Sequence, residues 1–143
     1  MIKQLPLLCA GRIFFGPFPE QETLMQLRAK KVTVVWNLMS ELSGLFELES
    51  KLFTHAINTP IDDYDIPRTL QFLQDLDRVV AYLQAGQDVY IHCQGGHGRT
   101  GMALAALTVR LAKVSPEAAL QYSLRHCQGP EREHQKQFIR ETL

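Results

Sequence analysis

Apolar residues follow two kinds of spacing along this chain, which predicts a mixture of strands and helices. Continuous apolar runs at 12–16 and 32–38, rich in β-branched and aromatic residues, are typical of strands buried on both faces. Shorter runs at 55–57 and 88–92 predict two more strands. Strands without polar alternation belong to parallel sheets covered by helices on both sides, so the pattern indicates an α/β fold.

Between these runs, apolar residues recur every three or four positions, as in amphipathic helices. The clearest example is 69–85, where a leucine and valine stripe is followed by Gly86 at the position of a C-terminal cap. Residues 40–44 are expected to form a loop. The other helices are expected at 20–30, about 46–52, 100–113, from Ser115-Pro116 onward and from Gly129-Pro130 onward.

These elements predict a three-layer α/β fold with a central, mostly parallel sheet of about four to five strands flanked by helices. The chain has 143 residues, 45% of them hydrophobic and 21% charged, which suits one domain spanning residues 1–143. Fifteen acidic residues balance fifteen basic ones, and this neutrality disfavours a nucleic-acid partner.

The apolar run at the start of the chain is too short for a signal peptide, and no apolar run reaches the roughly 18 residues of a membrane span. We therefore expect no membrane partner. The three cysteines, Cys9, Cys93 and Cys127, are odd in number and lack the close pairing of metal ligands. The sequence therefore predicts neither disulfides nor a metal site, and a reducing, cytoplasmic setting.

The stretch from His92 to Gly101, His-Cys-Gln-Gly-Gly-His-Gly-Arg-Thr-Gly, joins the last predicted strand to an apolar helix. A glycine-rich loop in this setting can turn several backbone N–H groups toward one anion, and the helix adds its positive end. Cys93 would be a thiolate nucleophile at the base of this loop. Arg99 carries a planar fork of donors that can bind two phosphoryl oxygens. The stretch predicts a phosphate-binding loop over a nucleophilic sulfur.

The remaining residues of the stretch would complete the site. Thr100 is placed to donate a hydrogen bond to the sulfur and help it leave, and His92 to anchor the loop through its side chain. The ring of His97 either favours more highly phosphorylated substrates or faces solvent. Three glycines are expected to adopt positive φ angles. The residues expected to surround the phosphate are Gln94, Gly95, Gly96, His97 and Gly98.

A second candidate for chemistry is the segment from Pro60 to Pro67, whose prolines predict a loop. It contains Asp62, Asp63 and Asp65. Expulsion of an alkoxide from a phosphate ester is costly, so a positioned carboxylic acid that protonates the leaving oxygen is needed. Aspartate is also favoured in turns, so all three residues are equally compatible with solvated turn positions.

The stretch at 92–101 resembles the His-Cys-five residues-Arg-Ser/Thr motif of the cysteine-dependent protein tyrosine phosphatase superfamily, in its compact dual-specificity branch. The resemblance implies hydrolysis of phosphate monoesters on phosphoproteins, on tyrosine and also on serine and threonine, through a phosphocysteine and without a metal or cofactor. Matched to the family's acid loop, the general acid falls on Asp63, with Asp65 second and Asp62 third.

Other activities stay open at this point: a phosphoinositide or RNA 5′-phosphatase, or a phosphate-binding module that has lost catalysis. Lipid-directed relatives tend to carry Lys in the loop, where this chain has Gln94 and His97. The expected partner is a phosphorylated protein or peptide. Outside the motif, the sequence favours solvated surface positions for Glu41, Gln135, Arg125 and Arg132. The alternatives are that Glu41 contacts the substrate, that the two arginines attract an anionic substrate, and, as the resemblance implies, that Gln135 faces the active site.

Overall fold

The computed structural model describes residues 1–41 and 44–143, so residues 42 and 43 of the predicted loop lie outside the described part. Five strands form one sheet in the order β1-β2-β5-β3-β4. All neighbours in it are parallel except the antiparallel pair of β1 with β2. The strands are β1 (Lys3–Leu5), β2 (Ile13–Gly16), β3 (Val34–Met39), β4 (His55–Ile61) and β5 (Val89–His92).

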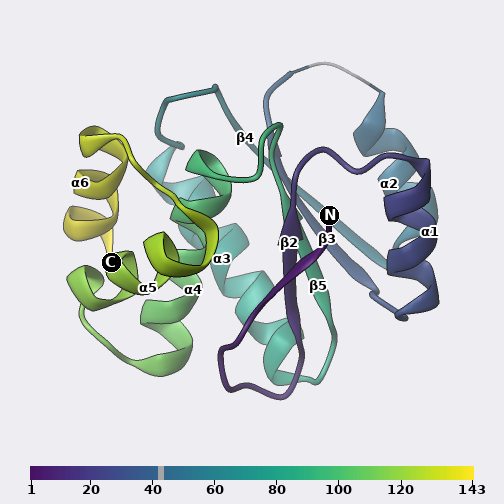
Figure 1. Ribbon diagram of the computed structural model, residues 1–143, viewed down its shortest axis with the longest axis horizontal. Coiled ribbons are helices and arrows are strands. Elements are labelled where there is room, and N and C mark those ends of the chain that lie inside the picture. Colours follow the sequence, from purple (N-terminus) through teal and green to yellow (C-terminus); the bar gives the residue numbers. More distant parts are fainter. Residues whose placement is uncertain (42–43) are drawn as a thin grey trace.

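Helices cover both faces of the sheet, which confirms the predicted three-layer α/β fold (Figure 1). One face carries α1 (Gln21–Ala29) and α2 (Leu45–Leu52). The other carries α3 (Thr69–Gln84), α4 (Gly98–Ala112), α5 (Pro116–Cys127) and α6 (Glu133–Thr142). Ser115 caps α5 as predicted, because its hydroxyl accepts the N–H of Ala118 at 3.2 Å.

The sheet divides the apolar core into a large and a small cluster. The large cluster lies under α3 to α6 and includes Ile91 and nearly every apolar residue of α4, while the small one lies under α1 and α2 around Phe14 and Tyr90. β5 pairs with β2 on one side and β3 on the other, so every residue of β5 is buried. Cys93 therefore follows the middle strand, at the sheet edge where open α/β folds bind ligands.

The largest differences from the predicted elements are a strand that was missed and two displaced boundaries. β1 was not expected, because Lys3 and Gln4 are exposed at the sheet edge and only Leu5 is buried, which leaves no apolar run. β4 continues through Pro60, which an edge strand tolerates because its outer N–H groups need no partner. α6 begins at Glu133 and not at Gly129-Pro130.

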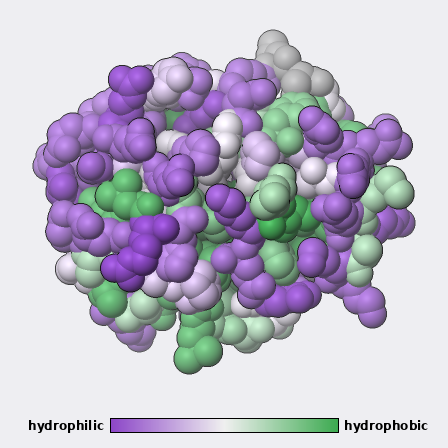
Figure 2. All heavy atoms as spheres, in the orientation of Figure 1, coloured by the Kyte–Doolittle hydropathy of each residue, from purple (hydrophilic) through white to green (hydrophobic). Residues whose placement is uncertain are grey.

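The surface is mainly polar. Hydrophilic residues predominate on the face shown in Figure 2, and hydrophobic residues form separate patches there. Within the described ranges, none of the helices combines the length and hydropathy that crossing a membrane requires.

Candidate active site

Cys93 lies at the base of the loop between β5 and α4, almost completely buried. Its sulfur accepts a hydrogen bond from the hydroxyl of Thr100 at 3.1 Å and another from the amide of Gly96 at 3.3 Å. α4 begins at Gly98, so the positive end of its dipole is directed toward the same loop. Two donors and a helix N-terminus therefore converge on one sulfur.

The loop is shaped by close packing against the end of β2. Gly96 has φ of +83°, and a Cβ at this position would lie 2.8 Å from the carbonyl carbon of Gly16. The prediction of positive φ was wrong for Gly95 and Gly98, which have ordinary negative-φ or extended backbone. A Cβ on Gly95 would meet only the His97 ring, at 3.9 Å. Of these three positions, glycine is required by the turn itself only at 96.

The segment between α5 and α6 supports the loop from the opposite side. A Cβ on Gly101 would lie 2.3 Å from the carbonyl carbon of Gly129, so the two backbones are in direct contact. The Nδ1 atom of His97 lies 2.8 Å from the carbonyl oxygen of Cys127. Because a carbonyl only accepts, Nδ1 carries the proton and Nε2 is the second, outward nitrogen. The exposed His97 ring is therefore attached to the α5–α6 connection.

Arg99 is buried, with 2% of its surface exposed, and its outer nitrogens are occupied. Nη1 donates to Oε1 of Glu41 at 2.6 Å and to the carbonyl of Ile61 at 2.8 Å, and Nη2 donates to Oε2 of Glu41 at 3.1 Å. The buried Nε has no hydrogen-bond partner among the described residues. The outer end of the Arg99 guanidinium is thus held by protein atoms, while Nε is not. A guanidinium binds oxyanions through such N–H donors, so Nε is available to bind a ligand.

Glu41 and Arg99 each stabilise the charged form of the other. Burial by itself disfavours the charged guanidinium, but the hydrogen bonds that it donates to Glu41 and the charges of Cys93, Glu41 and Asp63 outweigh burial and raise the pKa of Arg99. The same hydrogen bonds lower the pKa of Glu41. Glu41 lies at the surface as predicted, with its side chain 41% exposed, but its carboxylate is paired with Arg99 and is not simply solvated.

Of the three candidate acids, Asp63 approaches Arg99 within ion-pair distance, with Oδ1 3.6 Å from Nη2. Its side chain is 55% exposed at the mouth of the site. The carboxylates of Asp63 and Asp65 each accept the N–H of the following residue, at 3.1 and 2.8 Å, and Asp62 lies exposed in the same loop. The choice of Asp63 as the general acid stays a prediction.

α6 holds this acid loop in place. Nε2 of Gln135 donates to the carbonyl of Asp65 at 3.0 Å, and Nε2 of His134 contacts the carbonyl of Tyr64. Gln135 is 0% exposed, so the prediction of a solvated surface residue was wrong. Arg132 is exposed as predicted, with its guanidinium 4.5 Å from the centre of the Tyr64 ring.

His92 contacts a residue that sequence reasoning did not single out. Its Nε2 lies 2.6 Å from Oε2 of Glu49 on α2, and both side chains are fully buried. The side chain of His92, which was expected to anchor the loop by hydrogen bonds, bonds to α2. The available sequence signal was a glutamate one turn after Leu45, on the apolar face of a predicted helix.

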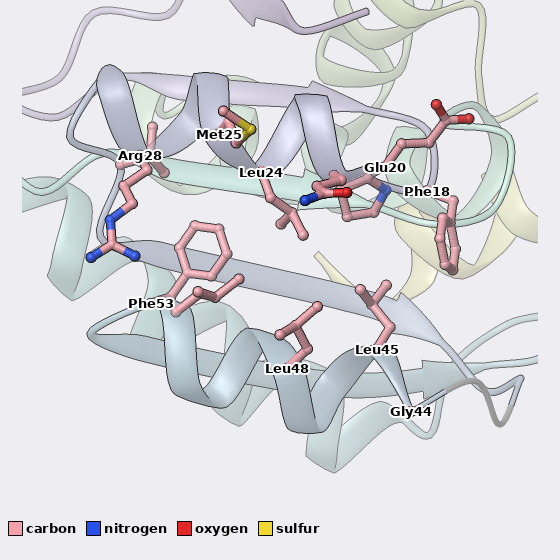
Figure 3. Close-up of a pocket in the computed structure, with 13 residues that line it drawn as sticks. Phe18, Glu20, Leu24, Met25, Arg28, Gly44, Leu45, Leu48 and Phe53 are labelled. Carbon is pink, nitrogen blue, oxygen red and sulfur yellow. The ribbon is translucent and has the colours of Figure 1, made fainter.

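An apolar groove lies away from this chemistry. A cavity of about 620 Å³ separates α1 from α2, with Leu24 and Met25 on one wall and Leu45 and Leu48 on the other (Figure 3). Cys93, by contrast, is not among its lining residues. The groove therefore contains no nucleophile and is not the reaction site.

A central parallel strand that ends in a Cys-five residues-Arg loop defines the class of cysteine-dependent phosphatases. A family model described as "Tc-R-P: Polymorphic toxin system, DSP-PTPase phosphatase" matches residues 14–113. The chain belongs to this dual-specificity family within the cysteine-dependent protein tyrosine phosphatase superfamily.

Individual relatives agree with this assignment. The chain is 31% identical over 134 residues to "Putative tyrosine phosphatase 067L" of Invertebrate iridescent virus 3, a match that covers 90% of this chain and 56% of the viral protein. It is 28% identical to 197R of Invertebrate iridescent virus 6 over 76% of this chain and 43% of that protein. The chain thus spans about half the length of the viral relatives it matches.

Solved structures show the same fold. The structure of Tk-PTP in its active form is 25% identical, with a TM-score of 0.80 over 93% of this chain and 94% of that one. Kinase associated phosphatase, at 20% identity, superposes with a TM-score of 0.84 over 99% and 92% of the two chains.

Proposed function

We propose that this phosphatase hydrolyses phosphate monoesters on phosphoproteins, with phosphotyrosine preferred and phosphoserine and phosphothreonine accepted. Residues 1–143 would act as one catalytic domain in a reducing, cytoplasmic setting, which a thiolate nucleophile requires. The observation that carries the proposal is the buried, unpartnered Nε of Arg99, which belongs to the same loop as the doubly hydrogen-bonded sulfur of Cys93.

In the first step, the Cys93 thiolate attacks phosphorus in line with the ester oxygen, so an S–P bond forms as the P–O bond breaks. Asp63 gives its proton to the departing oxygen. Arg99 and the backbone amides of residues 94–98 bind the equatorial oxygens, where they stabilise the charge of the transition state. The carboxylate of Glu41 supports this role, because it fixes the guanidinium from the side away from Nε.

In the second step, the Asp63 carboxylate takes a proton from water. The water oxygen then bonds to phosphorus, and the S–P bond breaks to release phosphate. The leaving sulfur carries negative charge, and the hydroxyl of Thr100 at 3.1 Å supports its departure. Neither step requires a metal or a cofactor.

The substrate preference rests on the shape of the site. The acid loop is exposed from Asp62 to Ile66, and Tyr64 is 61% exposed, so among the described residues this loop forms no deep wall that would admit only long side chains. A shallow site of this kind admits the shorter phosphoserine and phosphothreonine beside phosphotyrosine. The viral relatives are named as tyrosine phosphatases, which also supports the preference.

Turnover of para-nitrophenyl phosphate in excess chelator tests the reaction, with Cys93→Ser as the comparison. We expect vanadate-sensitive turnover in the parent and none in Cys93→Ser. Absence of turnover in the parent would indicate a binding module instead. The values of kcat/KM are then compared for matched phosphotyrosine and phosphothreonine peptides, a soluble phosphoinositide and 5′-triphosphate RNA. A higher kcat/KM on the lipid headgroup or the RNA would contradict the phosphoprotein preference.

A further inference from the structure

Helix α2 carries a carboxylate at a position where its packing favours a hydrophobic residue. Leu45 and Glu49 lie one turn apart and are the buried residues of this helix, and Glu49 is 0% exposed. A buried carboxylate loses hydration, and a well-packed hydrophobic residue of similar volume usually serves stability as well or better. Stability therefore does not explain the glutamate, and its contacts have to be considered.

The two oxygens of Glu49 face donors from two different strands. Asn37 of β3 donates its Nδ2–H to Oε1 at 2.8 Å, and Nε2 of His92 in β5 lies 2.6 Å from Oε2. Asn37 cannot reverse its amide, because its Oδ1 already accepts the N–H of Met39 at 2.8 Å. Two donors thus require an acceptor at both oxygens, which a carboxylate supplies and an amide does not.

The first of these donors, His92, adjoins the nucleophile. His92 is the residue before Cys93 in the chain, and its ring is enclosed between Glu49 and the Tyr90 ring, whose centre is 5.7 Å away. Burial, followed by the charges of Glu49 and Cys93, raises the pKa of Tyr90, which is consistent with all three groups sharing one electrostatic environment. A shift of the His92 ring would therefore move the start of the phosphate loop.

The other donor leads to Arg99. Asn37 and Met39 bracket an irregularity in the pairing of β3 with β4. Nδ2 of Asn58 stabilises it by donating to their two carbonyls, at 2.9 and 3.1 Å. From this bulge the chain passes directly to Glu41, the residue that holds the guanidinium of Arg99. The hydrogen bond from Asn37 to Glu49 therefore secures the strand end that presents Glu41.

We propose that Glu49 is a positioning residue that fixes Cys93 and the Glu41–Arg99 pair relative to each other, through His92 on one side and Asn37 on the other. This inference rests on the proposed phosphocysteine mechanism. Glu49 touches no reacting atom, so its effect appears in the alignment of nucleophile and guanidinium. Alignment matters most in the transition state, and the loss therefore falls on kcat more than on KM.

Glu49→Gln tests the inference, because it keeps the shape of the side chain and supplies only one acceptor oxygen. We expect kcat for para-nitrophenyl phosphate to fall about tenfold or more, with KM within about threefold of the parent. Glu47→Gln, an exposed position on the same helix, is the matched control and should keep both parent values. His92→Gln retains a donor near the place of Nε2, so its kcat should fall less than that of His92→Ala.

The outcomes separate this inference from the proposed function. A folded Glu49→Gln protein with the parent kcat, even at a reduced Tm, would overturn the positioning role while Cys93→Ser remains inactive. Turnover by Cys93→Ser would instead overturn the proposed mechanism, whatever Glu49→Gln does. Where Glu49→Gln does not fold, the two His92 variants decide, and equal kcat values in His92→Gln and His92→Ala contradict the inference.

Discussion

Glu41 and Arg99, 58 residues apart in the chain, are joined by two hydrogen bonds that use both carboxylate oxygens and both outer guanidinium nitrogens. This arrangement fixes the plane of the guanidinium. With the bond from Nη1 to the carbonyl of Ile61, three of its five N–H groups are used, which leaves the second N–H of Nη2 and the buried Nε–H, and Nε has no hydrogen-bond partner in the described residues. The pair therefore orients the group that would bind the phosphate in the transition state.

Glu41→Gln should weaken this orientation, because an amide offers one acceptor where the guanidinium needs two. We predict that kcat/KM for para-nitrophenyl phosphate falls about tenfold or more. Steady-state kinetics beside Glu47→Gln, an exposed acid of α2, provide the check. Equal kcat/KM values in the two variants would show that Glu41 has no such role.

The same pair predicts a pH-dependent stability. The pKa of Glu41 is lowered from its ordinary 4.5 in the folded state. The ion pair therefore contributes its full share to the free energy of unfolding above pH 4.5, and this share is lost as the pH falls through the lowered pKa. The parent should melt about 2–4 °C above Glu41→Gln at pH 7, since a partly exposed pair contributes about 1 kcal/mol or less. Thermal melts between pH 7 and pH 3 should show this difference constant above about pH 5 and closing below pH 4. A difference that widens toward acid contradicts the assignment.

Gly96 and Gly95 form a matched pair in the phosphate loop. Gly96→Ala should destabilise the fold by about 1–3 kcal/mol and abolish most activity, since its φ is +83° and a Cβ would press against Gly16. Gly95→Ala should be tolerated, because its Cβ would make only an ordinary contact with His97. Urea unfolding and para-nitrophenyl phosphate turnover measure both effects, and equal losses in the two variants would be inconsistent with this loop geometry.

Asp63→Ala and Asp65→Ala distinguish the two leading candidates for the general acid. Loss of a positioned acid costs about a hundredfold or more in rate, and the loss is greatest for esters with poor leaving groups. We expect this loss for Asp63→Ala on phenyl phosphate and a small change for Asp65→Ala, because Asp63 is the one of the two that lies within ion-pair distance of Arg99. A strong loss confined to Asp65→Ala would transfer the role to that residue.

The parts of the fold and site that sequence reasoning anticipated are those governed by local pattern. The buried strands and the Cys93-to-Arg99 loop are contiguous, so their residues and glycines reveal them without knowledge of the fold. The order of the three aspartates came only from the family resemblance. The short β1 was missed because one buried leucine gives no periodic signal.

The missed contacts connect distant parts of the chain. Glu41 and Arg99 are separated by 58 residues, Glu49 and His92 by 43, and Gln135 and Asp65 by 70. On composition alone, an acid or an amide between helices is expected to be solvated. Only the packing of α2 and α6 around the sheet turns these three side chains toward the site.

The phosphocysteine itself provides the most direct test of the account. Asp63→Ala should slow hydrolysis of the intermediate more than its formation from para-nitrophenyl phosphate, whose leaving group needs little protonation. Acid-quenched samples of this variant, digested and measured by mass spectrometry, should carry one phosphoryl group on the peptide containing Cys93, and Cys93→Ser should carry none there. Rapid turnover in the parent with no phosphoryl group on Cys93 at any quench time, or with the group on another residue, would contradict the mechanism.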